Sequence, residues 1–153
     1  MDENIVEFVV PGPPVGKGRP RFSTINGHAV AYTPEKTASF ENLVRLAYKQ
    51  AYPDKKPFDK GVQLSVTINA YFPIPKATSK KKAALMKERQ IRPTTKPDLD
   101  NLAKSICDAL NKVAFYDDSQ VVVLKVRKFY DETPQTDIII FDINAENCYY
   151  DRY

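Results

Sequence analysis

KPDLDNLAK, residues 96–104, is the stretch around which the sequence is organised. It places two carboxylates, Asp98 and Asp100, two residues apart, after a proline and ahead of an apolar-periodic run. Pro97 suits the approach to a helix and either aspartate is a natural N-cap, so we expect a helix from here to about Val113. Its apolar residues recur at helical spacing and predict one buried face, made by Leu99, Leu102, Ala103, Ile106, Leu110 and Val113.

The same predicted helix has a charged flank. Lys104 lies one turn beyond Asp100, within reach of anything that Asp100 binds. A second acidic pair, Asp117-Asp118, closes the segment and precedes a β-rich run. These acids either hold a divalent metal or belong to a solvated helix start, where they cap helices and turns and Lys104 pairs with Asp100 and Asp108 on the surface. We interpret them as metal ligands. Because Mg²⁺ prefers carboxylate oxygens and usually takes one or two of them with water and substrate phosphate, the pattern favours a phosphoryl-transfer site.

Basic residues bracket the acids on both sides. A net charge of +4 and a pI near 9.0 weakly favour a polyanionic partner. The stretch VGKGRPRF, residues 15–22, is expected to be an exposed loop that either meets a nucleic-acid backbone or is merely solvated. A lysine-rich helix capped by Thr78-Ser79 and running to about Gln90 is either ordered by substrate or a plain solvated helix. The residues predicted to contact DNA are Lys17, Arg19, Arg21, Lys80, Lys81, Lys82 and Lys96.

Length and composition predict one domain spanning residues 1–153, ordinary for a soluble globular protein. No apolar run approaches the roughly 20 residues of a membrane span. The segment Met1 to Asn4 lacks an apolar signal core, so we expect a cytoplasmic protein without membrane contact. Cys107 borders the predicted helix face and is expected to be a reduced core thiol.

Two kinds of chemistry are not expected. The lone histidine, His28, lies in an Asn-Gly turn signal, which disfavours a Ser-His or Cys-His nucleophile. The Walker loop pattern is absent, so no nucleotide cofactor is expected.

The remaining patterns predict an α+β domain. Strands are expected at 5–10, 62–72, 120–130 and 136–143, and the 62–72 segment alternates so that its even-numbered residues face inward. A helix is expected to start at Thr33-Pro34, with Thr33 as N-cap, and to run to Ala51. The predicted order is β-α-β-α-α-β-β, with a mixed sheet and helices packed mainly on one face. The tail, residues 146–153, is expected to fray or to pack on a partner.

This combination resembles the RusA family of Holliday junction resolvases, small endonucleases of phages and prophages. D-x-D-N alone is common, but D-x-D-N-x-x-K-x-x-x-D-A-L followed shortly by D-D-x-Q is specific. The matching pieces are the first strand with Gly12-Pro13, Lys17 to Arg21, Tyr32-Thr33-Pro34, Asp98 to Lys104, Asp108 to Leu110, and Phe115 to Val121.

The resemblance implies a crossover junction endodeoxyribonuclease acting in DNA recombination and repair. It implies a homodimer that nicks two opposed strands of a four-way DNA junction, with Mg²⁺ as cofactor and Mn²⁺ as its substitute. The implied metal ligands are Asp98, Asp100 and Asp118, with Lys104 as the catalytic lysine. Asp117 either forms the turn and supports a ligand or replaces Asp118 as ligand.

How the implied site is completed stays open. The helix carries the chain about 17 Å from Asp100 to Asn111, and the seven residues to Asp118 span at most about 25 Å. One chain or a partner subunit could therefore supply the last ligand.

Two other functions are alternatives. A non-catalytic DNA-binding protein would explain the basic clusters but would leave aspartates that repel phosphate. A metal-dependent phosphatase acting on small phosphates is the other. Haloacid-dehalogenase-type enzymes carry D-x-D-x-[TV] directly after a strand near the N-terminus, whereas here Leu102 occupies the T/V position and the motif starts a helix mid-chain.

Overall fold

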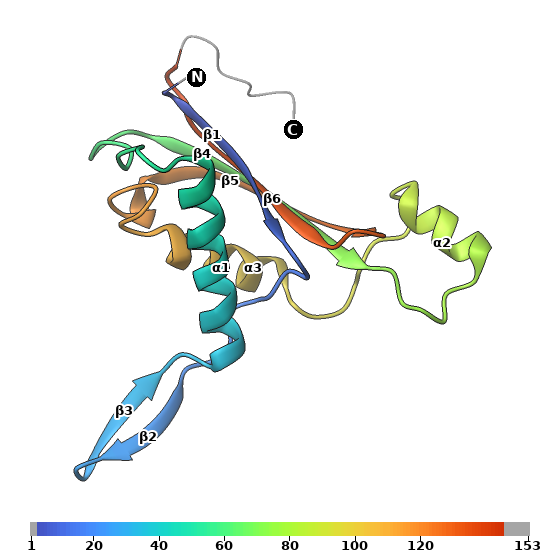
Figure 1. Ribbon diagram of the computed structural model, residues 1–153, viewed down its shortest axis with the longest axis horizontal. Helices are drawn as coiled ribbons and strands as arrows, with labels where there is room; N and C mark the ends of the chain where they lie inside the picture. The colour runs from blue at the N-terminus through green and yellow to red at the C-terminus, as the bar shows by residue number, and fades with distance from the viewer. Residues whose placement is uncertain (1–2, 146–153) are drawn as a thin grey trace.

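The central element of the protein is a four-stranded mixed sheet in the order β1-β6-β4-β5, seen obliquely in Figure 1. In the computed structural model, which describes residues 3–145, these strands are β1 (Ile5–Pro11), β4 (Leu64–Pro73), β5 (Val121–Asp131) and β6 (Gln135–Asp142). β6 runs antiparallel to both β1 and β4, whereas β4 and β5 are parallel. A parallel pair needs a crossover connection, and that connection contains the KPDLDNLAK stretch.

β4 differs from the predicted strand because both of its faces are buried. Leu64, Val66 and Ile68 face inward as predicted, but Ser65 and Thr67 are also only 2% exposed. The reason is position: β4 lies between β6 and β5, so neighbouring side chains flank it on both sides.

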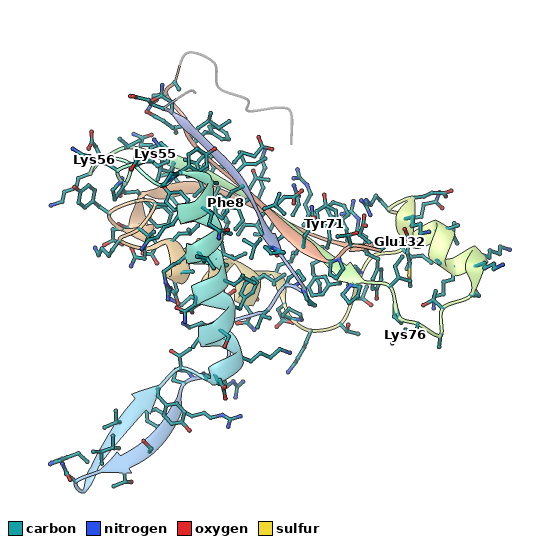
Figure 2. All side chains as sticks on the ribbon, viewed as in Figure 1. Phe8, Lys55, Lys56, Tyr71, Lys76 and Glu132 are labelled. Atoms are coloured by element: carbon teal, nitrogen blue, oxygen red, sulfur yellow. The ribbon has the colours of Figure 1, made fainter. Side chains whose placement is uncertain are left out.

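Two helices cover one face of the sheet, as predicted. α1 (Glu35–Ala51) and α3 (Leu99–Leu110) pack against each other and against the strands, with Val10, Val44 and Ile106 in their shared core. Figure 2 places Phe8 beside α1, where its ring lies 5.5 Å from that of Tyr48 in an edge-on arrangement. The protein is therefore a single α+β domain with its main core between this helix pair and the sheet.

The helix boundaries correct three details of the prediction. α1 begins at Glu35 with Pro34 as N-cap, not at Pro34 with Thr33 as N-cap. α3 ends at Leu110 and not near Val113, because Asn111 is extended and Lys112 has a positive φ of 67°. Leu99, expected on the buried face, is 44% exposed because the helix has only begun there.

A β-hairpin is the element that the predicted order lacks. β2 (Arg21–Ile25) and β3 (His28–Tyr32) follow β1 and precede α1 along the chain. They pair antiparallel and project beyond the body of the protein (Figure 1). Asn26 and Gly27 have φ of 51° and 79°, so the Asn-Gly signal correctly marked the turn. The flanking strands escaped prediction because all ten of their residues are exposed and carry no inward-facing pattern.

A third helix, α2 (Lys80–Lys87), lies at one end of the sheet (Figure 1). Ser79 caps it by accepting a hydrogen bond from the Lys82 N–H at 3.3 Å, which confirms the predicted cap at this position. The chain after α2 returns to the sheet, where the Arg89 guanidinium lies 5.1 Å from the rings of both Tyr71 and Phe129. These rings alternate with the core residues of their strands, so they lie on the face opposite α1 and α3.

Two predictions concern the chain ends and the membrane. The tail at 146–153 lies outside the described residues. Over residues 3–145, no helix is both long enough and apolar enough to cross a membrane.

Candidate active site

The first turn of α3 presents two aspartates to solvent. Asp98 occupies the N-cap position with extended backbone, yet its side chain makes no capping hydrogen bond in the described structure. Asp98 and Asp100 are both exposed. The capping role that the sequence left open for Asp98 is therefore not what its carboxylate does here, and both carboxylates face outward at a helix N-terminus.

Lys104 follows one turn later and is held by a neighbour on the same helix. Its ammonium lies 3.0 Å from Asp108 Oδ1, while its side chain remains 60% exposed. A lysine has three donors, so this contact leaves others that can point to solvent or substrate. Asp108 thus orients Lys104 without covering it.

Lys17 joins α3 to α1 through a line of alternating charges. Its ammonium lies 2.6 Å from Glu41 Oε1 on α1 and 3.1 Å from the second oxygen of Asp108. Arg45 approaches the other Glu41 oxygen at 3.9 Å. Partial burial acts to lower the pKa of Lys17, but its hydrogen bonds to Glu41 and Asp108 outweigh it and raise that pKa above the ordinary 10.5.

Replacing Lys17 by methionine should lower the free energy of unfolding by about 2 kcal/mol, because Glu41 is buried and, among the described residues, would keep only Arg45, at 3.9 Å, as an ion-pair partner. The exposed lysine at the end of α1 offers a matched control, and Lys49→Met should change stability by less than about 0.5 kcal/mol. Urea denaturation of both variants measures the difference. Equal stabilities would show that the ion pairs of Lys17 contribute nothing.

The same substitution carries a pH signature. Because the pKa of Lys17 is raised on folding, its stabilising contribution is present below its ordinary pKa of 10.5 and is lost as pH rises through the folded value. The difference between wild type and Lys17→Met should therefore persist at neutral pH and disappear in strongly alkaline solution.

The second acidic pair forms a tight turn before β5. Asp117 caps the short 3-10 helix η1 (Asp118–Gln120): its carboxylate accepts a hydrogen bond from the Ser119 N–H at 3.1 Å. Gln120 closes the turn by accepting from the Asp117 N–H at 3.1 Å and donating to the Asp59 carbonyl at 2.8 Å. Asp117 is thus turn-forming, and the glutamine of D-D-x-Q ties this turn to the loop ahead of β4.

Asp118 is placed beside the second half of α3. Its N–H donates to Asn111 Oδ1 at 3.2 Å. The side-chain hydrogen bond with Asp117 raises the pKa of Asp118, with partial burial and the charges of Asp117 and Asp108 adding to it and Lys104 opposing it. The pKa of Asp117 is lowered, chiefly by the Ser119 backbone N–H. The Asp117 carboxylate therefore keeps its charge most readily, and Asp118 is the partner that protonates first.

Cys107 lies within the same group of charges. Burial raises the pKa of its thiol to about 11, and the negative charges of Asp118 and Asp108 add to the effect. The thiol is free and half-buried, so it is protonated at neutral pH, as expected of a reduced thiol at the edge of the core.

The remaining cations predicted to contact DNA are dispersed. Arg19, Arg21 and Lys96 are exposed around the loop that leads to the hairpin and the turn that leads to α3. Lys80, Lys81 and Lys82 are exposed on the first turn of α2, at the end of the sheet. Lys17 differs from all of these because its charge is already paired within the protein.

The loop between β1 and β2, which contains Gly16 and Gly18, is bonded to the turn that bears Asp98 and Asp100. The Lys17 N–H donates to the Asn101 carbonyl at 2.9 Å. A Cβ on Gly16 would stand 2.6 Å from Pro97 Cβ and 3.2 Å from Asn101 Cβ, which is closer than side-chain carbons approach. The glycine is required here because the loop backbone lies directly on the first turn of α3.

Gly16→Ala should therefore lower both stability, by about 1–3 kcal/mol, and any activity that depends on Asp98 and Asp100, because the turn must move to admit the methyl group. Gly61→Ala is the control: Gly61 has a φ of 82° and open space around it, so the substitution strains the backbone without touching the turn. Thermal melts of both variants, with an assay of that activity, give the comparison. A Gly16→Ala protein with wild-type activity would show that the loop does not position the turn.

Sequence reasoning missed some residues that organise this site. The sequence marks Asp108 only as part of a motif and as a surface partner of Lys104, a pairing that the structure contains. It marks Gln120 only as part of a motif and gives no role to Glu41 or Asn111. Glu41 had one usable signal, an acidic residue inside the apolar stripe of a helix. Gln120 had the signal of a capping box, because it follows Asp117 by three residues. Asn111 accepts a turn hydrogen bond from the Asp118 N–H that no spacing rule reveals.

These features define a small α+β protein with outward-facing carboxylates and an oriented lysine on one helix, an arrangement that suits phosphoryl transfer. The chain belongs to the RusA family, since the family model described as endodeoxyribonuclease RusA matches residues 11–141.

Two relatives support this membership. The Bacillus subtilis (strain 168) protein YqaN, described as uncharacterized, is 41% identical over 142 residues, covering 92% of this chain and 98% of that protein. The crossover junction endodeoxyribonuclease rusA of Lactococcus phage r1t is 34% identical over 90 residues, covering 58% of this chain and 62% of the phage protein. The family assignment predicted from the motifs is thus confirmed.

RusA-family nucleases are metal-dependent. Asp98, Asp100 and Asp118 offer carboxylate oxygens, the ligands that Mg²⁺ prefers. Over residues 3–145, however, no three His, Cys, Asp or Glu side chains lie close enough together to hold a metal ion. The donor chemistry fits a hard cation, whereas one chain in this conformation does not bring the three carboxylates into one group.

Proposed function

We propose that the protein is a Mg²⁺-dependent endodeoxyribonuclease that resolves four-way DNA junctions by paired nicks in opposed strands. The observation that carries this proposal is the first turn of α3, where Asp98 and Asp100 face solvent without a capping role, one turn ahead of Lys104. Membership of the RusA family, which implies branched DNA as substrate, gives that turn its chemical context.

The proposed metal ligands are Asp98, Asp100 and Asp118. A bound Mg²⁺ supplies positive charge that polarises a phosphate and makes a bound water more acidic, and Mn²⁺ is expected to substitute for it. Asp117 supports Asp118 from the turn.

The proposed role of Lys104 is to offset charge that grows on the phosphate or on the leaving oxygen. Asp108 Oδ1 lies 3.0 Å from the Lys104 ammonium, and the other oxygen of Asp108 lies 3.1 Å from the Lys17 ammonium. Lys17 therefore acts as a positioning residue for Lys104, while Arg19, Arg21, Lys80, Lys81, Lys82 and Lys96 are proposed to contact DNA phosphates.

A homodimer is part of the proposal. Two centres are needed for two nicks, and two-fold protein symmetry matches the paired cuts in a four-way junction. Asp118 is bonded through its backbone to Asn111, about 17 Å along α3 from Asp100. This separation supports the alternative in which a second subunit helps to complete the carboxylate group.

The test is cleavage of a synthetic four-way junction beside a linear duplex of the same arm sequence, with Mg²⁺ and with chelator. We expect symmetric nicks in the junction alone, abolished by chelator. Tight junction binding without any cutting would instead support a non-catalytic DNA-binding protein. Turnover of a small phosphate ester without DNA cutting would support the phosphatase alternative.

A further inference from the structure

The β2–β3 hairpin exposes more apolar surface than a solvated connection needs. Phe22 is 73% exposed, and Ile25, Val30 and Tyr32 are 39–55% exposed. All ten strand residues are exposed, so the hairpin contributes no side chain to the core. A lone two-stranded hairpin is marginally stable in water, and clustered exposed apolar side chains mark interaction surfaces. The hairpin therefore has the character of a binding element.

The strand register gives the hairpin two distinct flat faces. One face carries Tyr32, Val30 and Ile25. Arg21, paired with Tyr32, and His28, paired with Ile25, lie at the two ends of this face. Pairing of Phe22 with Ala31 puts the Phe22 ring on the other face, beside small side chains. Each face thus offers one exposed Phe or Tyr ring: Phe22 lies opposite the small Ala31, and Tyr32 lies opposite Arg21.

Charge indicates the kind of partner. No Asp or Glu occurs between Glu7 and Glu35, while this interval contains Lys17, Arg19 and Arg21. A polyanion suits such a segment, whereas a second copy of this chain carries a net charge of +4. Aromatic rings on an acid-free, basic element are the combination that binds nucleic acid through base stacking.

The root of the hairpin fixes where that partner would lie. The Lys17 N–H is bonded to the Asn101 carbonyl, and the Gly18 N–H to Thr37 Oγ1, each at 2.9 Å. A Cβ on Gly18 would stand 2.9 Å from Pro34 Cγ, so the loop is also pressed against the start of α1. The hairpin is thereby held in a set position relative to Asp98 and Asp100.

The hairpin is long enough to reach bases from that position. Five residues at about 3.4 Å each give a strand about 17 Å long, which exceeds the roughly 8.5 Å depth of the DNA major groove. The Asn26-Gly27 turn keeps the tip narrow.

We propose that the β2–β3 hairpin is a wedge that enters the branch point of four-way DNA, where Phe22 and Tyr32 stack on bases that have lost a stacking neighbour. This inference rests on the proposed function, since it deepens the choice of branched DNA as substrate. It also gives the exposed apolar surface of the hairpin a role, because apolar side chains inserted between bases hold base steps apart.

The experiment uses the full chain in chelator, so that binding is measured without cutting. Four-way junctions carry 2-aminopurine either beside the branch point or in mid-arm, and a linear duplex serves as reference. Wild type should raise fluorescence at the branch point only. Phe22→Ala/Tyr32→Ala should lose that rise and about tenfold or more in junction affinity, with less than about threefold loss for duplex.

Two further variants separate stacking from general effects. Phe22→Tyr/Tyr32→Phe keeps both rings and should behave as wild type. Leu46→Ala removes a 53%-exposed apolar side chain from α1 and should also behave as wild type. Because the hairpin residues lie outside the core, all variants should melt together with wild type.

The outcomes distinguish the two proposals. If wild type nicks the junction in Mg²⁺ but the double alanine variant matches it in fluorescence and affinity, the wedge is wrong and the nuclease stands. If wild type neither cuts nor prefers the junction, the proposed function fails and the wedge with it. If the alanine variant sediments as a smaller assembly than wild type, the hairpin binds a second copy, and the wedge is overturned.

Discussion

Replacing Asp100 by asparagine should reduce cutting of a four-way junction more than about a hundredfold, while junction binding is unchanged or tighter. The amide keeps the size of the side chain but removes a negative charge that a cation needs as ligand, and loss of a ligand should exceed the 10–100-fold effect typical of groups that merely support one. Without a cation, the same charge repels DNA phosphates, so its removal should not weaken binding.

The measurement for Asp100→Asn pairs a single-turnover cleavage rate in Mg²⁺ with a dissociation constant in chelator. Asp54→Asn removes one exposed carboxylate from the loop after α1 and is expected to leave both values near wild type. Parallel losses of binding and cutting in Asp100→Asn would instead indicate that Asp100 has a structural role.

Replacing Lys104 by methionine should lower the cleavage rate by about 10²–10³-fold, the effect of losing one donor aimed at developing charge. Stability should change little, because an exposed i,i+4 ion pair contributes only about 0.3–0.5 kcal/mol and Asp108 keeps Lys17 at 3.1 Å. Junction affinity should fall by less than about threefold. The effect of Lys104 is thus expected on the rate and not on binding or folding.

Lys56→Met is the matched control for charge, because Lys56 is exposed on the loop after α1. Figure 2 labels it at the opposite side of the protein from Lys76, which lies near α2. Cleavage rates and chemical denaturation of both variants complete the comparison. Unchanged turnover in Lys104→Met would remove Lys104 from the mechanism.

Much of the fold followed from periodicity in the sequence. The helices and sheet strands with a strongly apolar side, such as α3 and β4, were predicted because burial imposes a period that the residues display. The hairpin was missed for the opposite reason: Phe22 and Tyr32 are large and aromatic but face solvent, so no core dictated a pattern around them. The turn at Asn26-Gly27 was recognisable because its backbone angles select those residues locally.

The candidate site was predicted less completely. The motif identified the family and drew attention to Asp98, Asp100, Lys104 and Asp118, whose catalytic and metal-binding roles stay predictions. Spacing could not show that Lys17 is paired with Glu41, since that contact joins residues 24 apart through the packing of α1 against α3. A turn-forming role was one of the two predictions for Asp117, and the structure contains that turn. Spacing could not show that the Asp118 carboxyl shares a hydrogen bond with Asp117.

The central claim is that a divalent cation recruits acidic side chains that would otherwise repel DNA. A crystal structure of the protein with Mn²⁺ and a four-way junction, with the metal located by its anomalous scattering, tests it most directly. We expect Mn²⁺ bonded to oxygens of Asp98, Asp100 and Asp118, from one subunit or from two, beside a DNA phosphate. Junction DNA bound with these carboxylates apart and free of metal would contradict the account.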